Sequence, residues 1–89
     1  MLKITTKADA TGTIFELEGK LTGAWVEELR NCWEQAALVN QSLTIMLKAV
    51  TFIDEPGRAL LAEIYRSGAE LTGEGCMTKA IIERIVRAD

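Results

Sequence analysis

Four residues between an apolar run and a helix-like run are the first place to look for chemistry. They are Asp54, Glu55, Pro56 and Gly57, within the stretch "FIDEPGRALL". Adjacent carboxylates can share acid and base work, but consecutive residues at a corner usually point apart. The chain contains no histidine, which removes the commonest general base and the Ser-His and Cys-His nucleophile pairs. We therefore expect no enzymatic activity and no catalytic residue.

The cysteines do not indicate a metal site. Cys32 and Cys76 are separated by 43 residues, and no CxxC motif is present. This is not a recognisable spacing of zinc ligands, and no glycine-rich phosphate loop is found. We expect neither a metal nor a cofactor. Both cysteines are predicted to be small, mostly buried apolar residues in a reducing compartment.

Length and composition favour one soluble globular domain over residues 1–89. The chain is 48% hydrophobic and carries a net charge of −3. This charge offers no basic patch for nucleic acid or for an anionic membrane. The apolar runs are too short to span a bilayer, and "MLKITTKADA" lacks the apolar region of a signal peptide. We expect a cytoplasmic protein without nucleic-acid binding or direct membrane insertion.

Three segments have the pattern of strands before the corner. Runs 2–6 and 13–19 flank the turn-forming "KADATG" and predict a hairpin with a loose loop. In the second run, Phe15 and Leu17 alternate with glutamates, as in a half-buried strand. Segment 42–54 is apolar on both faces, which predicts a central strand covered on both sides.

Segments with helical periodicity lie between these strands and after them. Segment 21–40 predicts a helix that Thr22 caps and Asn40 ends, with one core face made of Trp25, Leu29, Cys32, Trp33 and Ala36. Segment 56–68 predicts a second helix ending at a glycine, with Arg58, Glu63 and Arg66 facing water. A weak strand over 69–75 precedes a last helix over 76–89, whose apolar stripe is Ile81, Ile82, Ile85 and Val86. The order β-β-α-β-α-β-α predicts an α/β domain with a mixed β-sheet.

This arrangement, with the stretches "LEGKLTG", "VTFIDEPGRALL" and "GAELTGEGCMTKAIIERI", resembles the STAS domain family. That family includes the bacterial anti-sigma-factor antagonists and cytoplasmic domains of some anion transporters. The resemblance extends over essentially the whole chain and implies a STAS-like domain that binds a partner protein. In the antagonists, it implies a serine at the start of the second helix that the anti-sigma factor, a kinase, phosphorylates. Phosphorylation adds about −1.5 to −2 of charge to the docking surface and ends the binding.

Residue by residue, the family motif is only partly present. Asp54 matches the family's aspartate and Gly57 its glycine, but Glu55 and Pro56 stand at the two positions that are usually serines. The phosphorylated serine would correspond to Pro56, which has no hydroxyl. We therefore expect no phosphorylation at this motif.

Two interpretations of the corner remain beside the catalytic one. In the structural interpretation, Pro56 is the first helical residue, Asp54 accepts hydrogen bonds from the first turn, and Gly57 allows close packing. In the functional interpretation, the corner is a permanently set docking surface, for which the predicted partner-binding residues are Lys20, Thr22, Asp54, Glu55, Pro56, Gly57 and Arg58.

The resemblance leaves several partners open. The first is an anti-sigma factor or similar kinase, which would make the chain a bacterial regulator of transcription. An alternative is the ATPase of an ABC lipid-transport complex, with this chain as the accessory STAS-type subunit. A third function is the binding of a small ligand or nucleotide in a pocket at the carboxyl end of the 43–53 strand. Whether the domain forms a homodimer is also left open.

Overall fold

The helices and strands follow the chain in the predicted order, β-β-α-β-α-β-α. The computed structural model describes residues 2–38 and 42–88. The elements are β1 (Leu2–Asp9), β2 (Gly12–Leu21), α1 (Ala24–Ala37), β3 (Leu43–Ile53), α2 (Glu55–Arg66), β4 (Glu70–Gly73) and α3 (Cys76–Ala88). The prediction of an α/β domain with a mixed sheet is confirmed.

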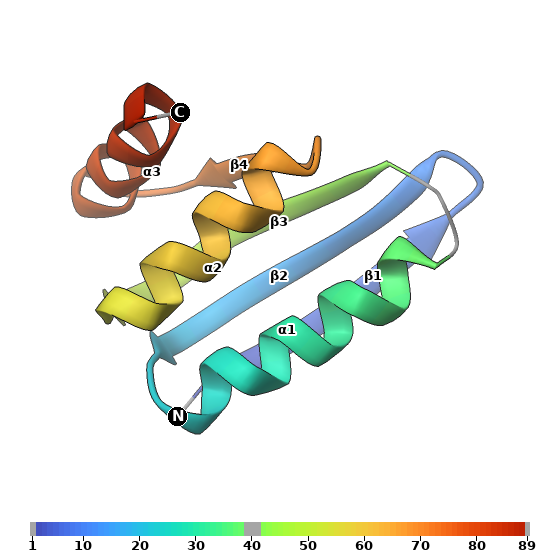
Figure 1. Ribbon diagram of the computed structural model, residues 1–89, viewed down its shortest axis with the longest axis horizontal. Coiled ribbons are helices and arrows are strands. Elements are labelled where there is room, and N and C mark those ends of the chain that lie inside the picture. The colour runs from blue at the N-terminus through green and yellow to red at the C-terminus, as the bar shows by residue number, and fades with distance from the viewer. Residues whose placement is uncertain (1, 39–41, 89) are drawn as a thin grey trace.

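The four strands form one sheet in the order β1-β2-β3-β4 (Figure 1). β1 pairs with β2 antiparallel, whereas β2–β3 and β3–β4 are parallel pairs that need the crossover helices α1 and α2. The ladder between β1 and β2 continues to the pair Asp9–Gly12, so only Ala10 and Thr11 connect the strands. The predicted loose loop is therefore wrong, because pairing extends to a two-residue turn.

The hydrophobic core lies between the helices and one face of the sheet. Period-2 alternation places Phe15, Leu17, Ile45 and Leu47 on this face, all nearly inaccessible to water. The helices bury residues at helical spacing against them, namely Val26, Leu29, Leu60, Leu61, Ile64 and Ile85. The second helix follows its prediction closely, with Gly68 at φ 108° just after its end.

The first helix packs its predicted face against the core at Leu29, Cys32, Trp33 and Ala36, but not at Trp25. Val26 and Leu29 are buried, whereas Trp25 is 36% exposed. The helix is capped by Gly23, at φ 56°, and not by the side chain of Thr22, so the core prediction for Trp25 and the cap prediction are both wrong. The physical reason is that the stripe of Val26, Leu29 and Trp33 faces the sheet, which leaves Trp25 beside it. Asn40 lies outside the described residues.

The remaining predictions for apolar and cysteine positions hold in part. Ile85 is buried and Ile81 and Ile82 pack against the core, but Val86 is 39% exposed, so its assignment to the stripe is wrong. Thr78 takes a buried place on α3 instead. Cys32 is half-buried, and this burial, with the nearby charge of Glu28, raises the pKa of its thiol. The side chain of Cys76 lies outside what the structure describes.

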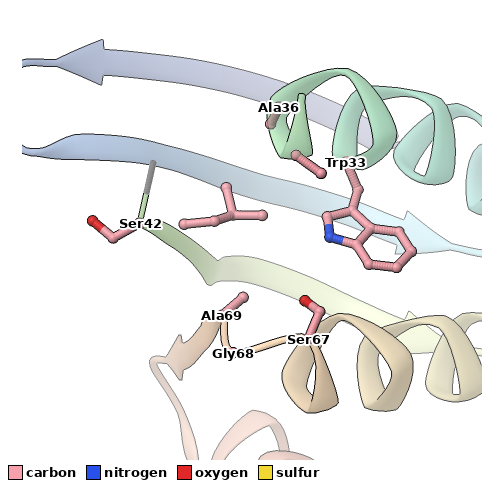
Figure 2. A pocket seen from close by; sticks show the side chains of 8 residues that line it. Trp33, Ala36, Ser42, Ser67, Gly68 and Ala69 are labelled. Atoms are coloured by element: carbon pink, nitrogen blue, oxygen red, sulfur yellow. The ribbon is translucent and has the colours of Figure 1, made fainter. Parts of the chain in front are cut away.

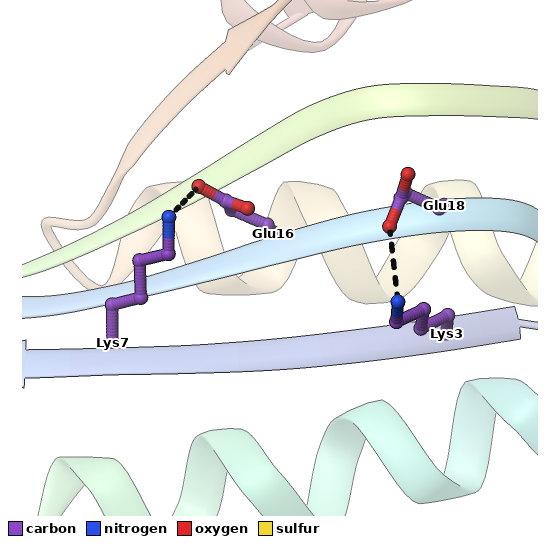
Figure 3. Close-up of polar contacts among 4 residues, drawn as sticks. All are labelled: Lys3, Lys7, Glu16 and Glu18. Atoms are coloured by element: carbon purple, nitrogen blue, oxygen red, sulfur yellow. Dashed lines mark ion pairs between the residues drawn. The ribbon is translucent and has the colours of Figure 1, made fainter.

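The second face of the sheet carries charged pairs (Figure 3). Lys7 Nζ lies 3.0 Å from a carboxylate oxygen of Glu16, and Lys3 Nζ lies 4.0 Å from one of Glu18. The hydrogen bond from Lys7 lowers the pKa of the Glu16 carboxyl. Met46 of β3 pairs with Glu16 of β2 and is only partly buried.

No helix of the described residues covers this second face, so the prediction of a strand covered on both sides is wrong. The strands β2, β3 and β4 lie in chain order. Right-handed crossovers that run in one direction place their helices on the same face of the sheet.

Truncation in the core and at Trp25 should therefore have unequal effects. Ile45→Ala removes a fully buried side chain and should lower the free energy of unfolding by about 2–5 kcal/mol. Trp25→Ala should cost clearly less, because part of the indole already contacts water. Urea unfolding of both variants measures the difference, and an equal or larger loss for Trp25→Ala would contradict the assignment of the α1 core face.

Candidate functional site

The carboxylate of Asp54 joins two loops at the carboxyl ends of β2 and β3. Asp54 is the N-cap of α2, and its Oδ1 accepts a hydrogen bond from the Gly57 N–H at 2.8 Å. Its Oδ2 accepts another from the Gly23 N–H, 3.0 Å away and 31 residues earlier in the sequence. The backbone N–H of Asp54 also donates to the Leu21 carbonyl at 3.2 Å. One side chain thus caps α2 and fixes the entry to α1.

Gly57 is required by close packing at this corner. It is buried, and a Cβ at this position would lie 2.8 Å from the Leu21 carbonyl oxygen and 3.0 Å from Oδ1 of Asp54. Such distances are too short for a side chain, so the start of α2 can approach β2 only with glycine here. The hydrogen bond and the close approach are those of the structural interpretation of Asp54 and Gly57.

The other predicted partner-binding residues surround this cap. Lys20 is exposed at the end of β2, and Thr22 is half-buried in the next loop. Glu55 and Pro56 are exposed as the first two residues of α2, so Pro56 is one position later than predicted. Proline has no N–H, and in the first turn of a helix this costs no hydrogen bond, because N–H groups there have no partner within the helix. The structure thus brings these residues together, and their contact with a partner stays a prediction.

Phe52 is an exposed aromatic residue beside the cap that the sequence analysis did not single out. It lies on β3 opposite Lys20 of β2, and 55% of it is accessible to water. Its position two residues before Asp54, at the end of an apolar run, was the available signal.

The sequence predicts that Arg58 faces water, and the structure differs from this prediction. It is partly buried, and its Nε is inaccessible to water and without a hydrogen-bond partner. Arg58 lines two hollows. The larger, of about 610 Å³, lies between β3, α2 and α3, and is lined by Val50, Thr51, Phe52, Ile53, Arg58, Glu74, Gly75, Thr78 and Ile81. The smaller, of about 330 Å³, lies between α2 and α3, and is lined by Glu55, Arg58, Ala59, Ala62, Arg66, Arg84 and Ile85.

A third hollow, of about 200 Å³, lies at the opposite end of the sheet (Figure 2). Trp33 forms one wall, and two serines contribute hydroxyls. Ser42 Oγ donates to the Thr11 carbonyl at 2.8 Å, and Ser67 Oγ donates to the Ile64 carbonyl at 2.6 Å. Because these hydroxyls are already engaged within the protein, this hollow is a weaker candidate than the corner.

The described part of the chain offers neither a metal-binding cluster nor a membrane-spanning helix. Within residues 2–38 and 42–88, no group of three or more histidine, cysteine, aspartate or glutamate residues is arranged to hold a metal ion. Over the same residues, no helix combines the length and the apolar character needed to cross a membrane.

The fold and the capped corner together define a small α/β module with parallel strands leading into helices. The STAS domain pattern matches residues 2–81 of the sequence. Because this match covers most of the chain, the protein belongs to the STAS domain family. No curated protein matches it.

Solved structures share the fold at low sequence identity. An anti-sigma-factor antagonist STAS domain from Rhodobacter sphaeroides aligns over 83% of this chain and 86% of its own, with 20% identity and a TM-score of 0.58. A Shewanella loihica protein described as having a SpoIIAA-like fold aligns over 85% of this chain and 69% of its own, with 15% identity and a TM-score of 0.57. The structure titled Mglu aligns over 81% of this chain, with 18% identity and a TM-score of 0.64. The aligned region is only 19% of the Mglu chain. These likenesses confirm the STAS-like, anti-sigma-factor-antagonist-like fold.

Removing the capping carboxylate should loosen both loops at once. Asp54→Ala leaves the Gly57 and Gly23 N–H groups without their acceptor and should lower the free energy of unfolding by about 1–2 kcal/mol. Urea unfolding gives this loss, and amide hydrogen exchange should speed up at both glycines. Glu55→Ala, one residue later and exposed, is the matched control and should change stability by less than about 0.5 kcal/mol. Unchanged exchange at Gly23 in Asp54→Ala would contradict the bridge.

Proposed function

We propose that this STAS domain acts without catalysis, by binding another protein at its corner surface. We define the corner surface as the accessible parts of Lys20, Thr22, Phe52, Glu55, Pro56 and Arg58. The observation that carries the proposal is the exposure of Phe52 at the end of a central strand, beside the exposed first turn of α2.

An exposed aromatic residue next to charged groups is a good anchor for a protein interface. Binding energy is concentrated in a few residues, in which aromatic side chains and arginine are enriched. Phe52 supplies an apolar centre, and Lys20 and Glu55 supply charges of both signs around it. The cap made by Asp54 holds the surface in one shape before binding, which reduces the entropy lost on docking.

The partner that we propose is an anti-sigma factor, with a role in bacterial transcription regulation in the cytoplasm. Support comes from the likeness to the Rhodobacter sphaeroides antagonist, which extends over 86% of that chain. Glu55 and Pro56 provide no hydroxyl in the first turn of α2, so the interaction would be constitutive rather than switched by phosphate there. An ATPase of an ABC lipid-transport complex is the alternative partner.

Partner capture with matched variants tests the docking surface. Wild-type protein, Phe52→Ala, Glu55→Arg and Leu38→Ala would each be tagged, used to capture proteins from the host, and compared by quantitative mass spectrometry. Leu38 is a large apolar residue, 86% exposed just after α1 and therefore at the other end of that helix from the corner, so it controls for loss of exposed apolar surface. We expect Phe52→Ala and Glu55→Arg to reduce capture by about tenfold or more, as loss of an anchor does.

The identity of the captured protein separates the two partners. An anti-sigma factor supports the regulatory role, whereas an ABC ATPase would replace it and leave the docking surface in place. Equal capture by all four proteins would contradict the corner surface itself.

Because Glu55 and Pro56 carry no hydroxyl, we also expect no phosphorylation at the start of α2. After incubation with ATP and the captured kinase, intact-mass and peptide mapping should find no phosphate on residues 54–57. The nearby Thr51 hydroxyl precedes the corner and donates to the Gly19 carbonyl at 3.4 Å. A phosphopeptide that maps to residues 54–57 would overturn the alignment of Pro56 with the family's serine.

A further inference from the structure

The 610 Å³ hollow beside the corner has the size and lining of a small-molecule site. It lies where the carboxyl end of β3 meets the first turns of α2 and α3. Val50, Phe52 and Ile81 give it apolar walls, and Arg58 and Thr78 contribute polar groups. Its volume falls within the range of known ligand pockets, which are mostly apolar with a few polar groups that orient the ligand.

Arg58 supplies the positive charge among the residues that line this hollow. Its Nε is inaccessible to water and unpaired, so a ligand in the hollow would reach the guanidinium through its two Nη groups, for which no internal partner is found among the described residues. The guanidinium fork can donate two parallel hydrogen bonds to the two oxygens of a carboxylate.

We propose that this hollow binds a small organic acid. Its carboxylate is held by Arg58, and its hydrocarbon body lies against Val50, Phe52 and Ile81. The site shares Phe52 and Arg58 with the corner surface. It goes beyond the protein-docking function, because the ligand contacts only this chain.

The surrounding charges favour a singly charged ligand. Gly75 and Thr78 place the start of α3 beside the hollow, and the N-terminal end of a helix is electropositive. Glu74 also lines the hollow and opposes an anion, but it is exposed, so water screens its charge more than that of the buried Arg58 Nε. Among the described residues, Arg58 is the one cationic side chain that lines the hollow, which disfavours nucleotides with several phosphate charges.

Titration of the purified chain with octanoate and octanamide tests the proposal. The two probes share a hydrocarbon body and differ in the charge of the head group. Binding constants come from calorimetry, and the site is located by amide chemical-shift changes. We expect octanoate to bind about tenfold more tightly than octanamide and to shift the amides of Val50, Gly75 and Thr78.

Variants of Arg58 separate charge recognition from a general structural effect. Arg58→Gln should weaken octanoate binding by about tenfold and leave octanamide binding unchanged, whereas Arg58→Lys should recover part of the loss. Arg87→Gln is the control, because Arg87 is exposed near the end of α3, where it pairs with Glu83. It should bind octanoate like the wild type.

Three results would overturn the proposal. They are equal affinity for octanoate and octanamide, equal shifts of the same amides by inorganic phosphate, and no shift of these amides by octanoate at millimolar concentration. Because no partner protein is present, these results are independent of the capture experiment.

Discussion

The corner of this protein depends on one carboxylate that accepts two backbone hydrogen bonds. Asp54 caps α2 through Gly57 and holds the loop before α1 through Gly23, so two segments far apart in the sequence share one anchor. The close approach of Gly57 to the Leu21 carbonyl completes the joint. Because these contacts use Asp54 and Gly57, the exposed positions between them can vary without changing the backbone.

Most of the fold could be predicted because its signals are local. Alternation at Phe15 and Leu17 and helical spacing through Leu60, Leu61 and Ile64 identify strands and helices independently of their neighbours. The errors arose where tertiary packing selects among similar local choices. Trp25 and Val26 are adjacent and both apolar, and only the docking of α1 on the sheet decides which one is buried. The coverage of a sheet face likewise depends on the direction of the crossovers, which no single segment records.

The candidate site could likewise be predicted only where its residues are close together in the sequence. The corner could be predicted because its residues are contiguous and have capping chemistry. The larger hollow could not, since it combines the end of β3, the start of α2 and the start of α3. Arg58 has the sequence signature of a solvent-facing helical residue, yet its Nε is inaccessible to water in the folded chain. The hollow that it lines is formed by three segments together.

The charge pairs on the open face also bear on how the molecule avoids self-association. β1 is an edge strand of eight residues, long enough to serve as a template for pairing with another chain. Lys3 and Lys7 place charged side chains on this edge strand, where each lies against a glutamate of β2. The opposite edge, β4, is only four residues long and ends in a glycine. The charged side chains on β1 and the shortness of β4 make both margins of the sheet poor templates for pairing with another chain.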